Sequence, residues 1–134
     1  MMIARAGLAF LMLSGAALAQ QPKIDCKTAQ SNVELGYCAE KEFERADAEL
    51  NRVFTRVLAA IDRQDHYTPE QRTKWKTALR ETQRNWVKFK EQDCGELIGY
   101  EWSGGTGTSL ASLGCQTEKT RTRTRDLVDR YEVK

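Results

Sequence analysis

The sequence predicts an all-α protein, in which two long helices form an antiparallel hairpin and a shorter C-terminal helix packs across it. Apolar residues recur at three- and four-residue steps over long segments, and two of these segments begin with helix-capping signals. No segment alternates apolar and polar residues for long enough to build a sheet. The four cysteines of this 134-residue chain add a prediction of two disulfides.

The first long helix is predicted to begin after Ser31. Ser31 and Glu34 have the spacing of a capping box, in which the serine caps the Glu34 amide and the glutamate reaches back. A polar turn is expected at residues 62–67. Between these points one apolar face continues through Leu35, Cys38, Ala39, Ala46, Leu50, Val53, Phe54, Val57, Leu58 and Ile61.

The second helix is predicted to begin after Thr68, with Pro69 at its first position and Gln71 completing a second capping box. Gly95 suits its end. The short turn between the two long helices favours an antiparallel hairpin. The third helix is expected over residues 116–131, with a thinner apolar face. The predicted buried face of the second helix comprises Trp75, Ala78, Leu79, Thr82, Trp86 and Phe89.

Residues 1–19 are predicted to be an export signal. Arg5 supplies a positive charge, residues 8–13 are apolar, and Ala17-Leu18-Ala19 fits a cleavage site before Gln20. The folded domain would then comprise residues 20–134, without a membrane anchor after cleavage. Loss of Arg5 takes the formal charge from +2 to +1. Since both signs of charge are interleaved, this composition argues against nucleic-acid binding.

The cysteines of an exported chain are expected to form disulfides rather than a zinc site, because no short Cys pair is present and His66 is distant in sequence. Four cysteines allow three connectivities. Geometry favours Cys26–Cys38, since residues 26–32 can fold back along the first helix. It also favours Cys94–Cys115, which would tie together the two ends of a glycine-rich loop between the second and third helices.

No catalytic motif is evident, so we expect a non-enzyme without a cofactor or a metal. His66 lies in a polar turn without an obvious cysteine or serine partner. The glycine-rich residues 104–109 lack the lysine of a Walker loop, and no long helix is expected directly after them. A phosphate site is therefore not predicted.

The aromatic residues separate into two groups. Trp75 and Trp86 lie about three helical turns apart, so both are expected to pack in the core. Tyr100 and Trp102 lie in the predicted glycine-rich loop, where no helical face requires them. They are either anchors for a protein partner or a plug for the open end of the hairpin, and the sequence leaves both readings open.

Three blocks of sequence resemble one family. Asp25–Phe54 contains a cysteine, a capped glutamate, a second cysteine and an A-D-x-x-L-N stretch, Glu81–Cys94 contains Q-R-x-W, and residues 104–123 contain GGTGTSLASLGC followed by T-x-x-R. Together they are similar to the lysozyme inhibitor LprI-type N-terminal domain, over about residues 25–131. Lys90 departs from the arginine expected there, which would weaken a bidentate carboxylate pairing. The resemblance implies a small, helical, disulfide-bearing domain that is periplasmic or secreted.

Two functions follow as hypotheses. The first is inhibition of a lysozyme-type muramidase by the disulfide-closed loop, with Tyr100, Glu101, Trp102 and Ser109 as the partner-binding residues. The alternative is a cell-envelope structural or adaptor protein that binds another periplasmic protein. Both expect a protein partner, and neither predicts an oligomeric state.

Overall fold

A computed structural model describes residues 24–133, and the predicted export signal lies outside this range. The described chain is a helical bundle without strands, which confirms the predicted fold class. None of its helices combines the length and the apolar character needed to cross a membrane. In chain order the elements are α1 (Asn32–Asp62), α2 (Pro69–Glu91), the π-helical segment η1 (Gln92–Leu97), α3 (Ile98–Glu101) and α4 (Thr108–Tyr131).

The first two helices begin where their capping signals predict. The Ser31 hydroxyl accepts the Glu34 amide, and the Glu34 carboxylate accepts the Ser31 amide at 3.0 Å. Hydrogen bonds from the Ser31 amide and hydroxyl, together with the Gln30 amide, hold the pKa of the Glu34 carboxyl below its ordinary value. Thr68 and Gln71 form the equivalent box at the start of α2, where Pro69 occupies the first helical position.

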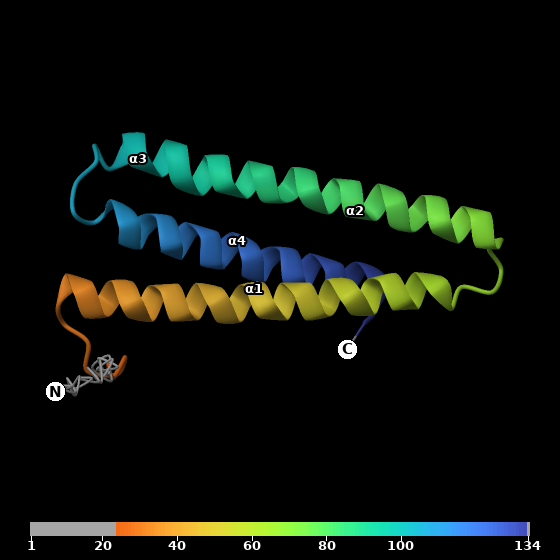
Figure 1. Ribbon diagram of the computed structural model, residues 1–134, viewed down its shortest axis with the longest axis horizontal. Coiled ribbons are helices and arrows are strands. Elements are labelled where there is room, and N and C mark those ends of the chain that lie inside the picture. The colour runs from red at the N-terminus through yellow and green to blue at the C-terminus, as the bar shows by residue number, and fades with distance from the viewer. Residues whose placement is uncertain (1–23, 134) are drawn as a thin grey trace, which may run out of the picture.

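α1 and α4 run in the same direction, and α2 runs antiparallel to both (Figure 1). The predicted hairpin of α1 and α2 is therefore present in its topology, although α1 makes its most extensive contact with α4. The buried face of α1 meets Leu79 of α2 and Leu127 of α4, and Trp75 and Trp86 pack against this core as predicted. The buried α1 residues are Ala46, Leu50, Val53, Val57 and Ile61.

Polar side chains connect the three long helices at their edges. Arg121 of α4 donates to Glu42 of α1 at 2.6 Å, and Lys76 of α2 pairs with Asp62 at the end of α1. On the third edge, Arg123 Nε of α4 donates to the Gln83 side-chain oxygen of α2 at 3.0 Å. These partly exposed contacts fix the helix register more than they stabilise the fold.

The segment after α2 departs most from the sequence prediction. Gly95 does not end the helix, because the chain continues through η1 and α3 as far as Glu101. α4 begins at Thr108 rather than at residue 116, so Cys115 lies inside it. Only residues 102–107 separate α3 from α4. The predicted loop between Cys94 and Cys115 is thus largely helical.

The end of α2 also turns a different face toward the core than its apolar pattern predicts. Phe89 is 52% exposed, whereas its neighbour Lys90 is only 4% exposed. The Lys90 ammonium lies 4.7 Å from the ring centre of Phe43 on α1 and 5.4 Å from that of Trp86. The predicted buried positions Phe89 and Leu35 are therefore surface residues, and a charged side chain fills the interior instead.

Candidate functional site

Both disulfides lie at the end of the bundle that holds the start of α1 and the whole of α3 (Figure 1). We call it the disulfide end. The favoured connectivity is confirmed: Cys26 pairs with Cys38, with Cα atoms 5.6 Å apart, and Cys94 pairs with Cys115, with Cα atoms 5.4 Å apart. The second bridge joins η1 to the second turn of α4. It therefore fixes α3 and the short connection between the bridged segments.

α3 ends in a Schellman motif that turns the chain back toward α4. The Gly104 amide donates to the Gly99 carbonyl at 3.2 Å, and the Ser103 amide donates to the Tyr100 carbonyl at 3.1 Å. Ser103 and Gly104 both have positive φ, at 52° and 66°. The connection is therefore a defined, hydrogen-bonded turn. The π-helical geometry just before it is of a kind that is frequent at functional sites.

The Trp102 ring lies flat against this turn. A Cβ added at Gly107 would come within 2.7 Å of Trp102 Cζ3 and 3.1 Å of Cε3. The glycine is therefore what allows the ring to approach the backbone. Even so, 51% of Trp102 remains exposed, and Tyr100 is 74% exposed. Both predicted readings thus hold in part for Trp102, whereas Tyr100 points into solvent.

Exposed apolar side chains gather at the disulfide end. Among residues 24–133, Tyr67 is the one large exposed hydrophobic residue that lies at the opposite end. Glu101 and Ser109, the other predicted partner-binding residues, are also exposed at the disulfide end. The exposed apolar residues there are Val33, Leu35, Tyr37, Phe89, Leu97, Tyr100 and Trp102. Such a concentration on one face is typical of an interaction surface.

The charge of this end is negative around the aromatic residues. Residues 92–117 contain Asp93, Glu96 and Glu101 but no lysine or arginine. Asp93 pairs with Lys119 at 2.8 Å. Glu96 and Glu101 are exposed and form no salt bridge within the described range, so their charges are available to a partner.

The acidic residues of α1 are less available than their number suggests. Glu42 pairs with Arg121, Glu44 pairs with Lys41, and Glu49 lies between Arg52 and Arg56. Asp47 accepts a hydrogen bond from Asn51. The unpaired acidic groups nearest to Tyr100 and Trp102 are therefore those of the chain after α2.

Neither a metal site nor a nucleotide site emerges at this end. Asp93, Cys94 and Cys115 bring potential ligand atoms together, but the two sulfurs are bonded to each other and the carboxylate is paired with Lys119. One reason given against a phosphate site was wrong, because a long helix does follow the glycine-rich residues. The missing Walker lysine still argues against such a site.

Comparison with known proteins connects this architecture to one family. Residues 25–127 match the lysozyme inhibitor LprI family. An uncharacterised protein of Rhizobium meliloti (strain 1021) is 35% identical over 125 residues, which cover 91% of this chain and 89% of that protein. No solved structure matches the chain. Because the family match extends over most of the chain, including all four cysteines, the protein belongs to the lysozyme inhibitor LprI family.

Proposed function

We propose that the protein binds a lysozyme-type muramidase through its disulfide end and inhibits it. The family description supports inhibition of lysozyme as the activity. The observation that carries the choice of surface is the pair Tyr100 and Trp102, which are 74% and 51% exposed on a helical turn held by a disulfide. Two disulfides are typical of proteins in an oxidising compartment, which supports a periplasmic or secreted location.

The fixed backbone favours tight binding by this surface. The Schellman turn and the Cys94–Cys115 bridge hold Tyr100, Trp102 and Ser109 in place before any partner arrives. Binding then costs less conformational entropy than it would for a slack loop. Tyrosine and tryptophan are also the residues most often found as energetic anchors of protein interfaces. In the proposed complex these rings occupy the sugar-binding cleft of the muramidase.

The charge around the rings favours the same class of partner. Glu96 and Glu101 are exposed and unpaired within residues 24–133, in a 26-residue stretch, residues 92–117, that lacks cationic side chains. Many lysozymes are strongly basic, so these carboxylates would attract the enzyme and orient it during association. In the complex, Glu101 faces cationic groups at the rim of the cleft. This local field compensates for the small net charge of the whole chain.

The experiment measures lysis of cell-wall suspensions by muramidases of several classes, in the presence of oxidised residues 20–134. We expect inhibition at stoichiometric concentrations. Tyr100→Ala and Trp102→Ala should each weaken inhibition by about 30-fold, the effect of an interface hot spot, and Glu101→Gln should weaken it less. Tyr67→Ala is the matched control, because Tyr67 is an exposed aromatic residue at the opposite end.

The outcomes separate the two hypotheses about function. Full lysis with every class of muramidase would contradict inhibition and leave the adaptor role as the better account of the family fold. Inhibition that Tyr67→Ala weakens as much as Trp102→Ala would contradict the choice of surface. Circular dichroism of each variant establishes that it is folded before its inhibition is compared.

A further inference from the structure

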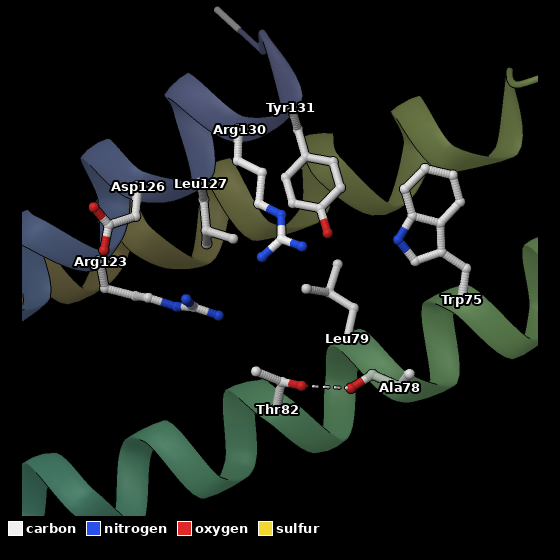
Figure 2. Close-up of a pocket in the computed structure, with 9 residues that line it drawn as sticks. All are labelled: Trp75, Ala78, Leu79, Thr82, Arg123, Asp126, Leu127, Arg130 and Tyr131. Carbon is white, nitrogen blue, oxygen red and sulfur yellow. Dashed lines mark hydrogen bonds between the residues drawn. The ribbon is translucent and has the colours of Figure 1, made fainter.

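A hollow of about 390 Å³ lies between α2 and α4, on the opposite half of the bundle from α3 (Figures 1 and 2). This volume falls in the range of small-molecule sites. Apolar side chains form part of its wall, including Leu79 of α2 and Leu127 of α4. The remaining lining residues are Trp75, Ala78, Thr82, Arg123, Asp126, Arg130 and Tyr131.

The hollow exists because the face of α4 that meets α2 is largely polar. Two arginines and an aspartate stand at the helical positions where a fully packed helix would present aliphatic side chains. α2 consequently packs against α4 over only a small part of its length. A second hollow continues along the same seam and shares Arg123 and Asp126 with the first. The gap is thus a property of the seam and not of one misplaced side chain.

Hydrogen-bond donors converge on the hollow. In Figure 2 the guanidinium groups of Arg123 and Arg130, the hydroxyl of Tyr131 and the indole nitrogen of Trp75 all point toward its centre. The Asp126 carboxylate points away from them. Neither arginine forms a salt bridge with any residue of the range 24–133. Arg123 uses one N–H group for its bond to Gln83 and keeps its other donors.

The electrostatics of the hollow favour an anion. Burial is the main influence on the pKa of Arg123, which it lowers, and the nearby Asp126 only partly opposes this effect. A guanidinium group that has lost water without gaining a salt bridge gains more from a bound carboxylate than an exposed one does. The hydroxyl of Thr82 is already donated to the Ala78 carbonyl at 2.9 Å, so the two arginines and Tyr131 supply the free donors.

We propose that this hollow binds a small organic carboxylate with a flat apolar or ring-shaped body. The carboxylate accepts hydrogen bonds from Arg123 and Arg130, and the body lies against Trp75 and the leucine side chains. This assignment goes beyond the proposed inhibition and does not depend on it, because the hollow and the exposed aromatic residues lie at different places along the bundle.

The experiment titrates the oxidised protein with benzoate and follows the indole signal of Trp75 and the side-chain signals of the arginines by NMR. Acetate keeps the charge without the ring, and benzyl alcohol keeps the ring without the charge. We expect saturable shifts of Trp75 and Arg130 with benzoate, and at least tenfold weaker binding of the two partial probes. Arg130→Gln should also weaken benzoate binding about tenfold.

Arg80→Gln is the matched control, since Arg80 is exposed on α2 and does not line the hollow. Its affinity for benzoate should equal that of the unchanged protein. Equal shifts from benzoate and acetate, or equal losses in Arg80→Gln and Arg130→Gln, would overturn the proposal by revealing a general response to anions. Absence of saturable shifts with benzoate would overturn it as well. Arg130 makes no hydrogen bond to α2 within the described residues, so its replacement leaves the Arg123–Gln83 contact between the helices in place.

Discussion

Lys90 is the residue whose chemistry is least expected from its surroundings. Its ammonium group is enclosed by the rings of Phe43 and Trp86, and it forms no salt bridge within residues 24–133. Burial lowers the pKa of Lys90, while the nearby Asp47 and Glu91 oppose that shift. The sequence suggested a cation paired with a carboxylate at this position. The structure places the cation between aromatic faces instead.

We predict that Lys90→Met stabilises the protein at neutral pH. The folded-state pKa lies below the ordinary value of 10.5, so the unfolded chain binds more protons in the alkaline window that ends there. The stability of the unchanged protein therefore rises with pH across that window as the buried charge is lost. Methionine removes the charge and keeps most of the volume, so the free energy of unfolding should increase by about 1 kcal/mol.

Urea unfolding at neutral pH and at about pH 10 checks this prediction, because the gain from Lys90→Met should shrink as the unchanged protein loses its proton. Lys88→Met serves as the control, since Lys88 is exposed near the same end of α2. It should change stability little at either pH. A Lys90→Met protein less stable than the unchanged one at neutral pH would show that the contacts with the two rings outweigh the cost of burial.

At the scale of elements, the turn between α3 and α4 depends on Gly107. Its φ of −81° and ψ of −11° suit any residue, so the reason for glycine here is the ring of Trp102 and not the backbone. We predict that Gly107→Ala moves this ring away from the turn, because the new Cβ would lie 2.7 Å from Trp102 Cζ3. The indole NMR signal of Trp102 should shift, whereas those of Trp75 and Trp86 should stay in place.

Gly114→Ala is the control for this prediction. Gly114 lies inside α4, and no atom lies within 4 Å of an added Cβ there. Alanine at that position should leave the Trp102 signal unchanged and increase the free energy of unfolding by about 0.5–1 kcal/mol through its higher helix propensity. A Trp102 signal that moves equally in both variants, or in neither, would contradict the account of Gly107.

The same elements show how far sequence reasoning reaches. The starts of α1 and α2 were predictable because Ser31 and Thr68 cap them with their own side chains. The start of α4 carries no such signal, since Gly107 offers no side chain to cap it. Gly95 suggested a helix end, but a glycine costs a helix only about 1 kcal/mol, which the neighbouring Cys94–Cys115 bridge can offset.

The candidate site was predictable to a similar extent. Tyr100 and Trp102 stood out because their neighbours were glycine and serine. Leu97 and Phe89 did not, because an apolar residue in a helical pattern is expected to face the core. Their exposure depends on the rotation of η1 relative to α2 and on the packing of Lys90 inward, and both are tertiary effects.

At the scale of the whole molecule, the two ends of the bundle are stabilised differently. The turn between α1 and α2 is closed by hydrogen bonds from Arg72 to the Gln64 and Tyr67 carbonyls. The opposite end is closed by two disulfides that act on separate segments. Cys26 is exposed and ties down the chain before α1, whereas Cys94 is fully buried and joins η1 to α4.

We therefore predict that the two bridges protect different parts of the molecule. Replacing either pair with serine should lower the free energy of unfolding by roughly 3 kcal/mol, the chain-entropy contribution of such a loop. The difference lies in where the structure opens. Without Cys26–Cys38, faster hydrogen exchange should be confined to the first turns of α1. Without Cys94–Cys115, it should extend over η1, α3 and the first turns of α4, and Tyr100 and Trp102 should lose their fixed positions.

Hydrogen exchange measured by mass spectrometry on both double-serine variants distinguishes these patterns, and the lysis assay on the same samples connects them to function. If the disulfide end is the inhibitory surface, removal of Cys94–Cys115 should weaken inhibition far more than removal of Cys26–Cys38, although the two losses of stability are similar. Equal inhibition by the two variants, combined with the expected difference in exchange, would mean that binding does not use the ordered α3–α4 turn.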